Sequence, residues 1–289
     1  MMKESFKDKL FRRTITVLLV IIAVIAVIPL MSTVAMSFSS STAADMNAVT
    51  LWPVDFTLAS WKHILQDITL WRSCAITAVS TILTVFFSVL VTALMAYPLS
   101  KSYFKAGRIL MIFVVLTVIF KAPVVPYFLT LKNLGFYNNP LVLVVPHIFS
   151  AYNMAIMRTS FKAFPGEIEE AAVIDGCGTA QVLFRIIFPS SKATLTTIGL
   201  FYAVTAWNQF QHPMMFITDV GWYPLQMRIR QMINGGTEVM LTVLKVRNEY
   251  NETTLSSATM IFAILPVVAV YPWLQKYFTK GAILGSVKG

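Results

Sequence analysis

The chain has 289 residues, of which 57% are hydrophobic and only 12% are charged, and its mean hydropathy is +0.71. A soluble domain carries about 25% charged residues, so this composition excludes a soluble protein and predicts a membrane protein. The net charge of +10 is high enough to suggest a nucleic-acid partner, but the distribution of the basic residues along the chain argues against one.

Six apolar runs follow one another along the chain, and each is about long enough to cross a hydrocarbon core of about 30 Å. They predict an all-α, polytopic membrane protein with both termini on the cytoplasmic side. The predicted transmembrane domain covers 14–278, after a basic lead at 1–13 and before a tail at 279–289. The predicted spans are 14–38, 73–98, 108–130, 140–158, 193–210 and 257–278.

The basic residues gather in the segments that this topology places inside. These are the amino terminus, 99–108, 158–192 and the carboxyl-terminal tail, which together hold 15 of the 23 Lys and Arg residues. Such a bias is the positive-inside signature of membrane proteins. The excess charge therefore predicts orientation against membrane lipid and requires no nucleic acid.

Four polar residues within or beside the spans are candidates for a substrate path: Lys121, Asn153, Asn208 and Gln209. An ionisable residue at membrane depth normally faces a cavity or a partner, so Lys121 could contact an anionic solute. Snorkelling of Lys121 to the interface is the alternative. Amide side chains could hydrogen-bond the hydroxyls of a solute, and helix–helix hydrogen bonding is the alternative for them.

The loop at 159–192 has the most readable local design. Pro165 suits a helix start, and Glu167, Glu169 and Glu170 follow near the positive end of the helix dipole. Gly176 and Gly178 are placed to end this helix. A second helix is predicted from about Thr179, stopped by Pro189. Small residues, acids and a glycine bend are what a docking element requires.

A family resemblance enters at this loop. Glu170-Ala171-Ala172, Gly176 four positions later, Ile186 and Pro189 resemble the "EAA" loop of ABC-importer permeases. Phe188 stands where that family has Leu. Further similarities to the sugar permeases are Ala96-Tyr97-Pro98-Leu99-Ser100-Lys101, the segment LGFYNN at 134–139 and Trp207-Asn208. The chain resembles the maltose-type carbohydrate permeases, and its closing segment resembles the branch typed by alginate and other acidic oligosaccharide permeases.

The resemblance implies a type I ABC importer fold, a place in a bacterial inner (cytoplasmic) membrane and separate tasks for separate subunits. It also implies that the substrate of the path residues Lys121, Asn153, Asn208 and Gln209 is a sugar, and an anionic one for Lys121. The loop would dock on an ATPase through Glu170, Ala171, Ala172, Asp175, Gly176, Ile186 and Pro189. The outer loop at 211–256 would reach a solute-binding protein, with Asn234-Gly235-Gly236-Thr237 as a tip. The implied partners are a second permease in a heterodimer, two copies of the ATPase and the binding protein.

No phosphate-binding loop of the type G-x-x-x-x-G-K-[ST] is present in the sequence. We therefore expect no enzymatic activity, no cofactor and no metal in this chain, with ATP and magnesium bound by the ATPase subunits. The alternatives are a permease for another small solute, a secondary transporter and a membrane enzyme. A secondary transporter would not explain the spacing of Glu170, Gly176 and Pro189.

Overall fold

The computed structural model describes residues 6–120, 122–235 and 250–286, and the regular structure in these ranges is helical. Contacts divide the chain into two units, built from Met1–Leu70 with Ile229–Leu265 and from Trp71–Arg228 with Pro266–Gly289. The first half of the chain forms α1 (Phe6–Ser37), α2 (Ser41–Asp45), α3 (Ala59–Gln66), α4 (Ile68–Ser100), α5 (Gly107–Ile119), α6 (Val124–Asn133), the 3-10 turns η1 (Pro140–Leu143) and η2 (Val145–His147), and α7 (Ala151–Lys162).

The second half continues with short helices around the predicted coupling loop and ends in one long helix. Its elements are α8 (Gly166–Ile174), α9 (Thr179–Gln181), the π-helical turn η3 (Val182–Ile187), α10 (Phe188–Ser190), α11 (Lys192–Trp207), α12 (Gln211–Phe216), η4 (Val220–Trp222), α13 (Leu225–Gly235) and α15 (Glu252–Ser286).

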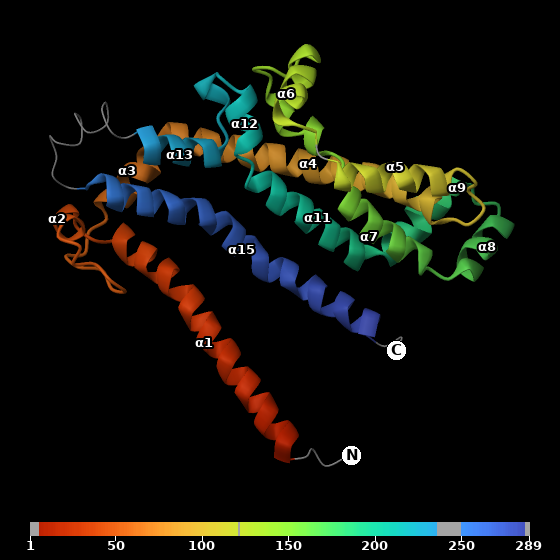
Figure 1. Cartoon of the computed structure of the whole chain (residues 1–289), viewed down its shortest axis with the longest axis horizontal. Coiled ribbons are helices and arrows are strands. Elements are labelled where there is room, and N and C mark those ends of the chain that lie inside the picture. Colours follow the sequence, from red (N-terminus) through yellow and green to blue (C-terminus); the bar gives the residue numbers. More distant parts are fainter. Residues whose placement is uncertain (1–5, 121, 236–249, 287–289) are drawn as a thin grey trace. The chain divides into compact units, whose positions relative to one another are not determined.

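In the first unit, α2 and α3 gather around the carboxyl-terminal end of α1 (Figure 1). Trp61 on α3 donates its indole N–H to the Ser37 hydroxyl at 3.3 Å and stacks on Phe38 with ring centroids 5.5 Å apart. The start of α15 joins this cluster through a hydrogen bond of 3.1 Å between the Thr254 and Ser60 hydroxyls. The segment between the first two predicted spans is thus folded and tied to the last helix.

The core of the second unit lies where α4, α5, α7, η3 and α11 meet. α7 and α11 pack side by side (Figure 1), joined by a hydrogen bond of 2.8 Å between the Ser160 and Thr194 hydroxyls. Gly199 of α11 faces Val85 and Val89 of α4, and a Cβ at this position would be in ordinary van der Waals contact with both, at 3.7 Å. Fully buried members of this core are Ala93, Ala96, Met154, Met157, Phe161, Ile187 and Ile198.

The predicted spans match the helices unevenly. Three helical segments are long and apolar enough to cross a membrane, Lys9–Ser37, Ile68–Ser100 and Glu252–Val270, and the count among the described residues is five if each of two bent pairs is one span. The predicted fifth span corresponds to α11, whose 16 residues measure about 24 Å. The six-span count therefore remains a prediction.

Proline chemistry explains why the predicted third and fourth spans are broken. The third bends by 117° between α5 and α6, because Pro123 disfavours helical geometry in the residue before it. The fourth bends by 44° between the 3-10 turns and α7, since Pro146 lacks the N–H that a continuous α-helix would use. In the fourth span side-chain caps start both pieces: Asn139 accepts the Leu141 N–H at 3.0 Å at the start of η1, and Ser150 accepts the Asn153 N–H at 3.4 Å at the start of α7.

Helical structure extends into three segments that were predicted to lie outside the spans. α1 begins at Phe6, inside the predicted lead at 1–13. α15 runs from Glu252 to Ser286, so it starts before the predicted sixth span and continues through most of the predicted tail at 279–289. The predicted outer loop at 211–256 holds helices α12 and α13. In each case polar residues beside an apolar run extend its helix or form a short helix of their own. That these segments lie outside the membrane remains a prediction.

Candidate functional site

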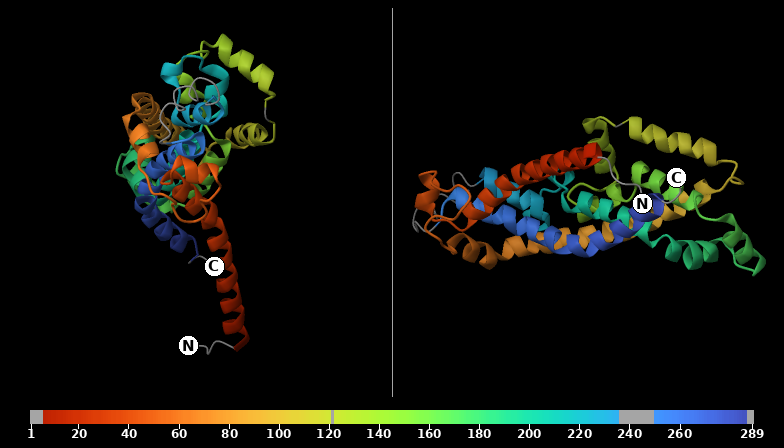
Figure 2. Two further views of the ribbon diagram at one scale, coloured as in Figure 1. Left: turned by 90° about the vertical axis from the view of Figure 1, so that its left-hand side faces the viewer. Right: turned by 90° about the horizontal axis from the view of Figure 1, so that it is seen from below.

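Helix α8 lies beyond the carboxyl-terminal end of α4 at one extremity of the second unit, as both figures show (Figures 1 and 2). Pro165 is its N-cap, and Glu167 and Glu169 occupy its first turn. Its end is a Schellman motif: Gly176 N–H bonds the Val173 carbonyl at 3.0 Å and Cys177 N–H bonds the Ala172 carbonyl at 2.9 Å. Gly176 has φ +84°, a conformation that favours glycine. The predicted glycine elbow at Gly176 is confirmed.

Gly178 does not end α8 but begins the next helix. Its N–H donates to the Gln181 side chain at 2.9 Å, at the start of α9. Helical structure then continues through η3 and α10, so the prediction that Pro189 stops this helix was wrong by a short margin. Pro189 lies inside α10, and the break comes at Ser191, whose φ and ψ are −98° and 19°. The missing N–H of Pro189 coincides with the end of the π-helical turn.

The inner face of α8 is tied to the rest of its unit. Ala172 is buried in the core, against η3. Glu169 accepts an ion-paired hydrogen bond from Lys101 and a hydrogen bond of 3.3 Å from the Tyr97 hydroxyl. The side chains of Lys101 and Glu169 are only 12% and 14% exposed, so this charge pair is largely shielded from solvent and more strongly coupled than a surface pair.

The end of α4 is fixed from a second side as well. Arg158 of α7 donates its Nε–H to the Leu99 carbonyl at 2.7 Å, which satisfies one of the carbonyls that a helix leaves unpaired at its carboxyl terminus. Lys101 lies above the Tyr97 ring, with its Nζ 4.8 Å from the centroid. α8 is thus mounted on the junction of α4 and α7.

The outer face of α8 is exposed and mixed in character. Ile174 is 85% exposed, and one turn of helix connects it to Glu170 and Ala171, which are also exposed. Glu167 lies on the same face at the positions i, i+3, i+4 and i+7 that neighbour one another on a helix. Exposed apolar side chains next to carboxylates suit a protein partner that offers an apolar groove with basic groups.

The remaining predicted coupling residues occupy different environments. Asp175 is the exposed C-cap of α8, Ile186 is half-buried against the core, and Pro189 is exposed. The structure therefore places Glu170, Ala171 and Asp175 on the surface. Ala172 lies on the buried side of α8, and Ile186 packs against the core near it.

A second site is a cavity of about 660 Å³ beside the bend between η2 and α7. Asn153 lines it and is buried. Tyr202 on α11 shapes the wall, since its hydroxyl shares a 2.8 Å hydrogen bond with Thr92 and accepts the Ser150 N–H at 3.0 Å. The lining combines neutral polar groups with aromatic rings and is made of Thr84, Pro146, His147, Phe149, Ser150, Tyr152, Asn153, Leu200, Phe201, Tyr202, Val204, Thr205 and Ala206.

The other predicted path residues do not line this cavity. Gln209 is buried and donates to the Leu143 carbonyl at 3.0 Å. Asn208 caps α11, donating to the Val204 carbonyl at 2.9 Å and accepting from Gln226 at 3.4 Å. Both make the helix and loop hydrogen bonds that were the alternative to a sugar contact. Lys121 lies outside the described residues.

The predicted tip of the outer loop is only partly described. Asn234 and Gly235 form the end of α13, and Gly236 and Thr237 lie outside the described residues. Among the residues that the structure does describe, no three His, Cys, Asp or Glu side chains gather where they could hold a metal ion.

Comparison with known proteins decides the family. The model of the family described as "Binding-protein-dependent transport system inner membrane component" matches residues 99–283. This chain belongs to that family. The match includes α8, its Glu169–Lys101 tie and all residues that line the cavity beside α7 except Thr84.

Relatives cover nearly the full length. The polygalacturonan/rhamnogalacturonan transport system permease protein YtcP of Bacillus subtilis is 33% identical over 98% of this chain and 100% of its own. Protein LplC of the same organism is 33% identical over 93% and 91%. A solved chain of a bacterial ABC transporter involved in the import of the acidic polysaccharide alginate matches with a TM-score of 0.90 and 30% identity, over 96% of this chain and 100% of that one. The fold of this family member is the type I ABC permease fold.

Sequence reasoning missed the partner of Glu169 and the role of Tyr202. Tyr97 and Lys101 stand in a segment that resembles the sugar permeases, and Glu169 directly precedes the Glu-Ala-Ala motif, so both halves of the tie lay in recognised motifs. No sequence signal joined them, because 68 residues separate Lys101 from Glu169.

Proposed function

We propose that this chain is one of two different permease subunits of an ATP-driven importer that takes up an oligosaccharide. In this proposal it pairs with the second permease, docks on one of two copies of an ATPase, and receives sugar from a solute-binding protein on the outer side. It lies in the inner membrane with both termini in the cytoplasm. ATP and magnesium belong to the ATPase subunits, since the sequence carries no phosphate-binding loop.

The observation that carries the proposal is the two-faced mounting of α8. Its outer face presents Glu170, Ala171 and Ile174, while its inner face is held by Glu169 and Ala172. A partner that moves the outer face therefore moves the ends of α4 and α7 with it, because the inner contacts resist separation. Closure of two ATPases on ATP would supply that movement.

The sugar assignment is supported by the relatives and by the cavity. Two of them are named for polygalacturonan/rhamnogalacturonan transport and for import of the acidic polysaccharide alginate. Sugar sites combine aromatic rings with hydrogen-bonding side chains, and the cavity offers Tyr152 and Phe149 beside Asn153 and Thr205. We propose that the cavity contacts sugar hydroxyls. The carboxylate of an acidic sugar would pair with a basic side chain outside the cavity, and Lys121 is the candidate in this chain.

The coupling role of Glu170 is tested by measuring sugar uptake in vesicles that carry the Glu170→Lys variant. A lysine on the outer face of α8 would repel the basic groups expected on the ATPase, so sugar uptake into energised vesicles should fall at least about tenfold. The tie of Glu169 to Lys101 is untouched, so the variant should still co-purify with the second permease. Glu170→Gln removes the charge without reversing it and should lose less.

If the Glu170→Lys variant takes up sugar at the rate of the wild-type protein, the docking role of Glu170 is contradicted. Uptake that is driven by an ion gradient and unaffected by vanadate would instead support a secondary transporter.

A further inference from the structure

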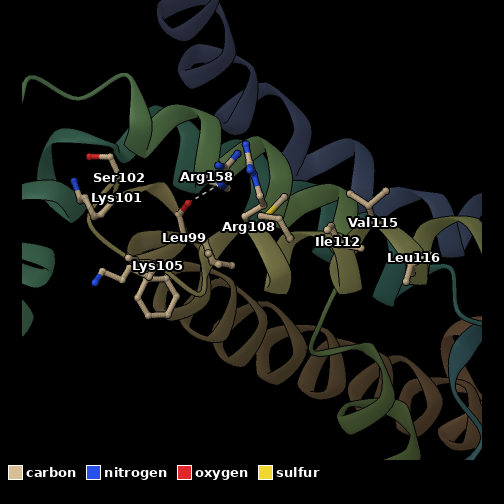
Figure 3. Close-up of a pocket in the computed structure, with 12 residues that line it drawn as sticks. Leu99, Lys101, Ser102, Lys105, Arg108, Ile112, Val115, Leu116 and Arg158 are labelled. Atoms are coloured by element: carbon tan, nitrogen blue, oxygen red, sulfur yellow. Dashed lines mark hydrogen bonds between the residues drawn. The ribbon is translucent and has the colours of Figure 1, made fainter.

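A groove of about 730 Å³ opens on the second unit near α8, on the side of α5 (Figure 3). It is formed by the end of α4, the connection to α5, one face of α5 and the side chain of Arg158 from α7. Its lining residues are Leu99, Lys101, Ser102, Phe104, Lys105, Gly107, Arg108, Met111, Ile112, Val115, Leu116 and Arg158.

One end of the groove is strongly basic. Four cationic side chains line it and no acidic one does. Lys101 is paired with Glu169, which leaves Lys105, Arg108 and Arg158 as the cations to be balanced. The Nε contact of Arg158 with the Leu99 carbonyl fixes its guanidinium plane, and Arg108 and Arg158 extend toward the same part of the groove (Figure 3). Two guanidinium groups gathered in this way favour an anion with several acceptor oxygens.

The other end of the groove is apolar. Met111, Ile112, Val115 and Leu116 line it at the spacing of one face of α5, following directly after Arg108. Ile112 and Val115 are about half exposed. The distance along the helix from Arg108 to Leu116 is roughly 12 Å, at 1.5 Å per residue. An occupant must therefore carry an anionic head and an apolar chain in one molecule.

We propose that this groove binds an anionic phospholipid, with its phosphate held by Arg108 and Arg158, the charge of Lys105 adding to the attraction, and an acyl chain lying along α5. Basic pockets between membrane helices on the cytoplasmic side are suited to such headgroups. A soluble anion would leave the apolar half of the groove unused, and an apolar protein helix would leave the three cations unbalanced. The placement of this end at the cytoplasmic leaflet rests on the proposed function, but the lipid chemistry does not.

Native mass spectrometry of the purified assembly tests the proposal directly. The assembly would be titrated with phosphatidylglycerol and, separately, with phosphatidylcholine of the same acyl chains. Phosphatidylglycerol should bind preferentially. Each basic residue near a membrane surface contributes about 1 kcal/mol to anionic lipid binding, which corresponds to about fivefold. Lys105→Gln with Arg108→Gln should therefore weaken binding roughly 30-fold.

Two controls accompany this variant, one that removes a cation outside the groove and one that keeps the charge inside it. Lys162→Gln removes an exposed cation at the end of α7 that does not line the groove, and it should leave binding unchanged. Arg108→Lys retains the charge and should keep most of the affinity. Equal losses in the double variant and in Lys162→Gln, or no loss in either, would overturn the proposal.

Two further arms separate lipid from other occupants. Glycerol phosphate, the soluble head alone, should not displace phosphatidylglycerol; displacement at equal concentration would assign the site to a soluble anion. Ile112→Trp should fill the apolar half and reduce phosphatidylglycerol binding while the subunits still co-purify. Loss of the second permease from that variant would assign the groove to a protein interface and overturn the lipid. Because uptake is not measured, failure here leaves the proposed transport function standing.

Discussion

Helix α8 and the cavity beside α7 belong to the same unit, yet the side chains that form them differ in chemical character. α8 exposes carboxylates and apolar side chains outward and is held by a shielded ion pair between Glu169 and Lys101. The cavity is lined by neutral polar and aromatic groups and is shaped by the hydroxyl contacts of Tyr202. The surface of α8 suits contact with a protein partner that moves it, and the lining of the cavity suits a small ligand that binds reversibly.

The difference lies in the strength of the contacts that each region uses. A shielded charge pair resists separation strongly, whereas a neutral hydrogen bond contributes only about 0.5–1.5 kcal/mol net. Strong internal contacts allow α8 to transmit displacement, whereas the wall of the cavity is held by weaker neutral hydrogen bonds. Substitutions should therefore have larger effects at α8 than in the cavity.

The largest effect is expected from Lys101→Met. It leaves the carboxylate of Glu169 shielded and without its ion-pair partner, which costs about 3 kcal/mol for a buried pair. Hydrogen exchange of the α8 amides should therefore accelerate roughly 100-fold. Lys162→Met, an exposed lysine with the same substitution, should leave these amides unchanged. Equal exchange in the two variants would mean that the pair does not hold α8.

A smaller effect is expected at the glycine elbow, where the chain offers a matched pair. Gly176 and Gly178 both have open space where a Cβ would stand, but only Gly176 has a positive φ, of +84°. Gly176→Ser should cost about 1–2 kcal/mol of local stability, and Gly178→Ser should be nearly neutral because serine is a favourable N-cap. Exchange of the Gly176 and Cys177 amide positions measures this difference; similar values would contradict the conformational argument.

The smallest effect is expected in the cavity. If the cavity contacts sugar as proposed, Asn153→Leu removes a hydrogen-bonding group from its wall and should raise the half-saturating sugar concentration about fivefold, with co-purification of the partners unchanged. Asn208→Leu is the control, because Asn208 caps α11 and does not line the cavity. A larger rise for Asn208→Leu would move the sugar path away from the cavity.

Local chemistry explains what could be predicted from the sequence. The α8 start at Pro165 and its end at Gly176 follow from rules that act within a few residues, and the apolar runs gave the helical class. The segment LGFYNN was recognised as a motif, and the structure shows its work: Gly135 and Asn138 have positive φ, and Asn138 accepts the Thr218 and Asp219 N–H groups at 3.2 and 3.0 Å.

Contacts between distant residues could not be predicted in this way. The Tyr202 hydroxyl meets Thr92 across 110 residues, and a single sequence carries no sign of which polar residues will pair. The breaks near Phe120 and Pro146 were missed for a related reason. Proline is tolerated in many membrane helices when neighbours satisfy the backbone, so its presence alone did not decide between a continuous and a bent span.

The central claim is that the two faces of α8 do different work, and a charge-exchange experiment tests it most directly. Sugar uptake would be measured for Lys101→Glu, for Lys101→Glu with Glu169→Lys, and for Lys101→Glu with Glu170→Lys. The single variant should lose about tenfold or more, exchange with Glu169 should restore at least about half of wild-type uptake, and exchange with Glu170 should restore none. Recovery of sugar uptake in the Lys101→Glu, Glu170→Lys variant, or no recovery in the Lys101→Glu, Glu169→Lys variant, would contradict this account.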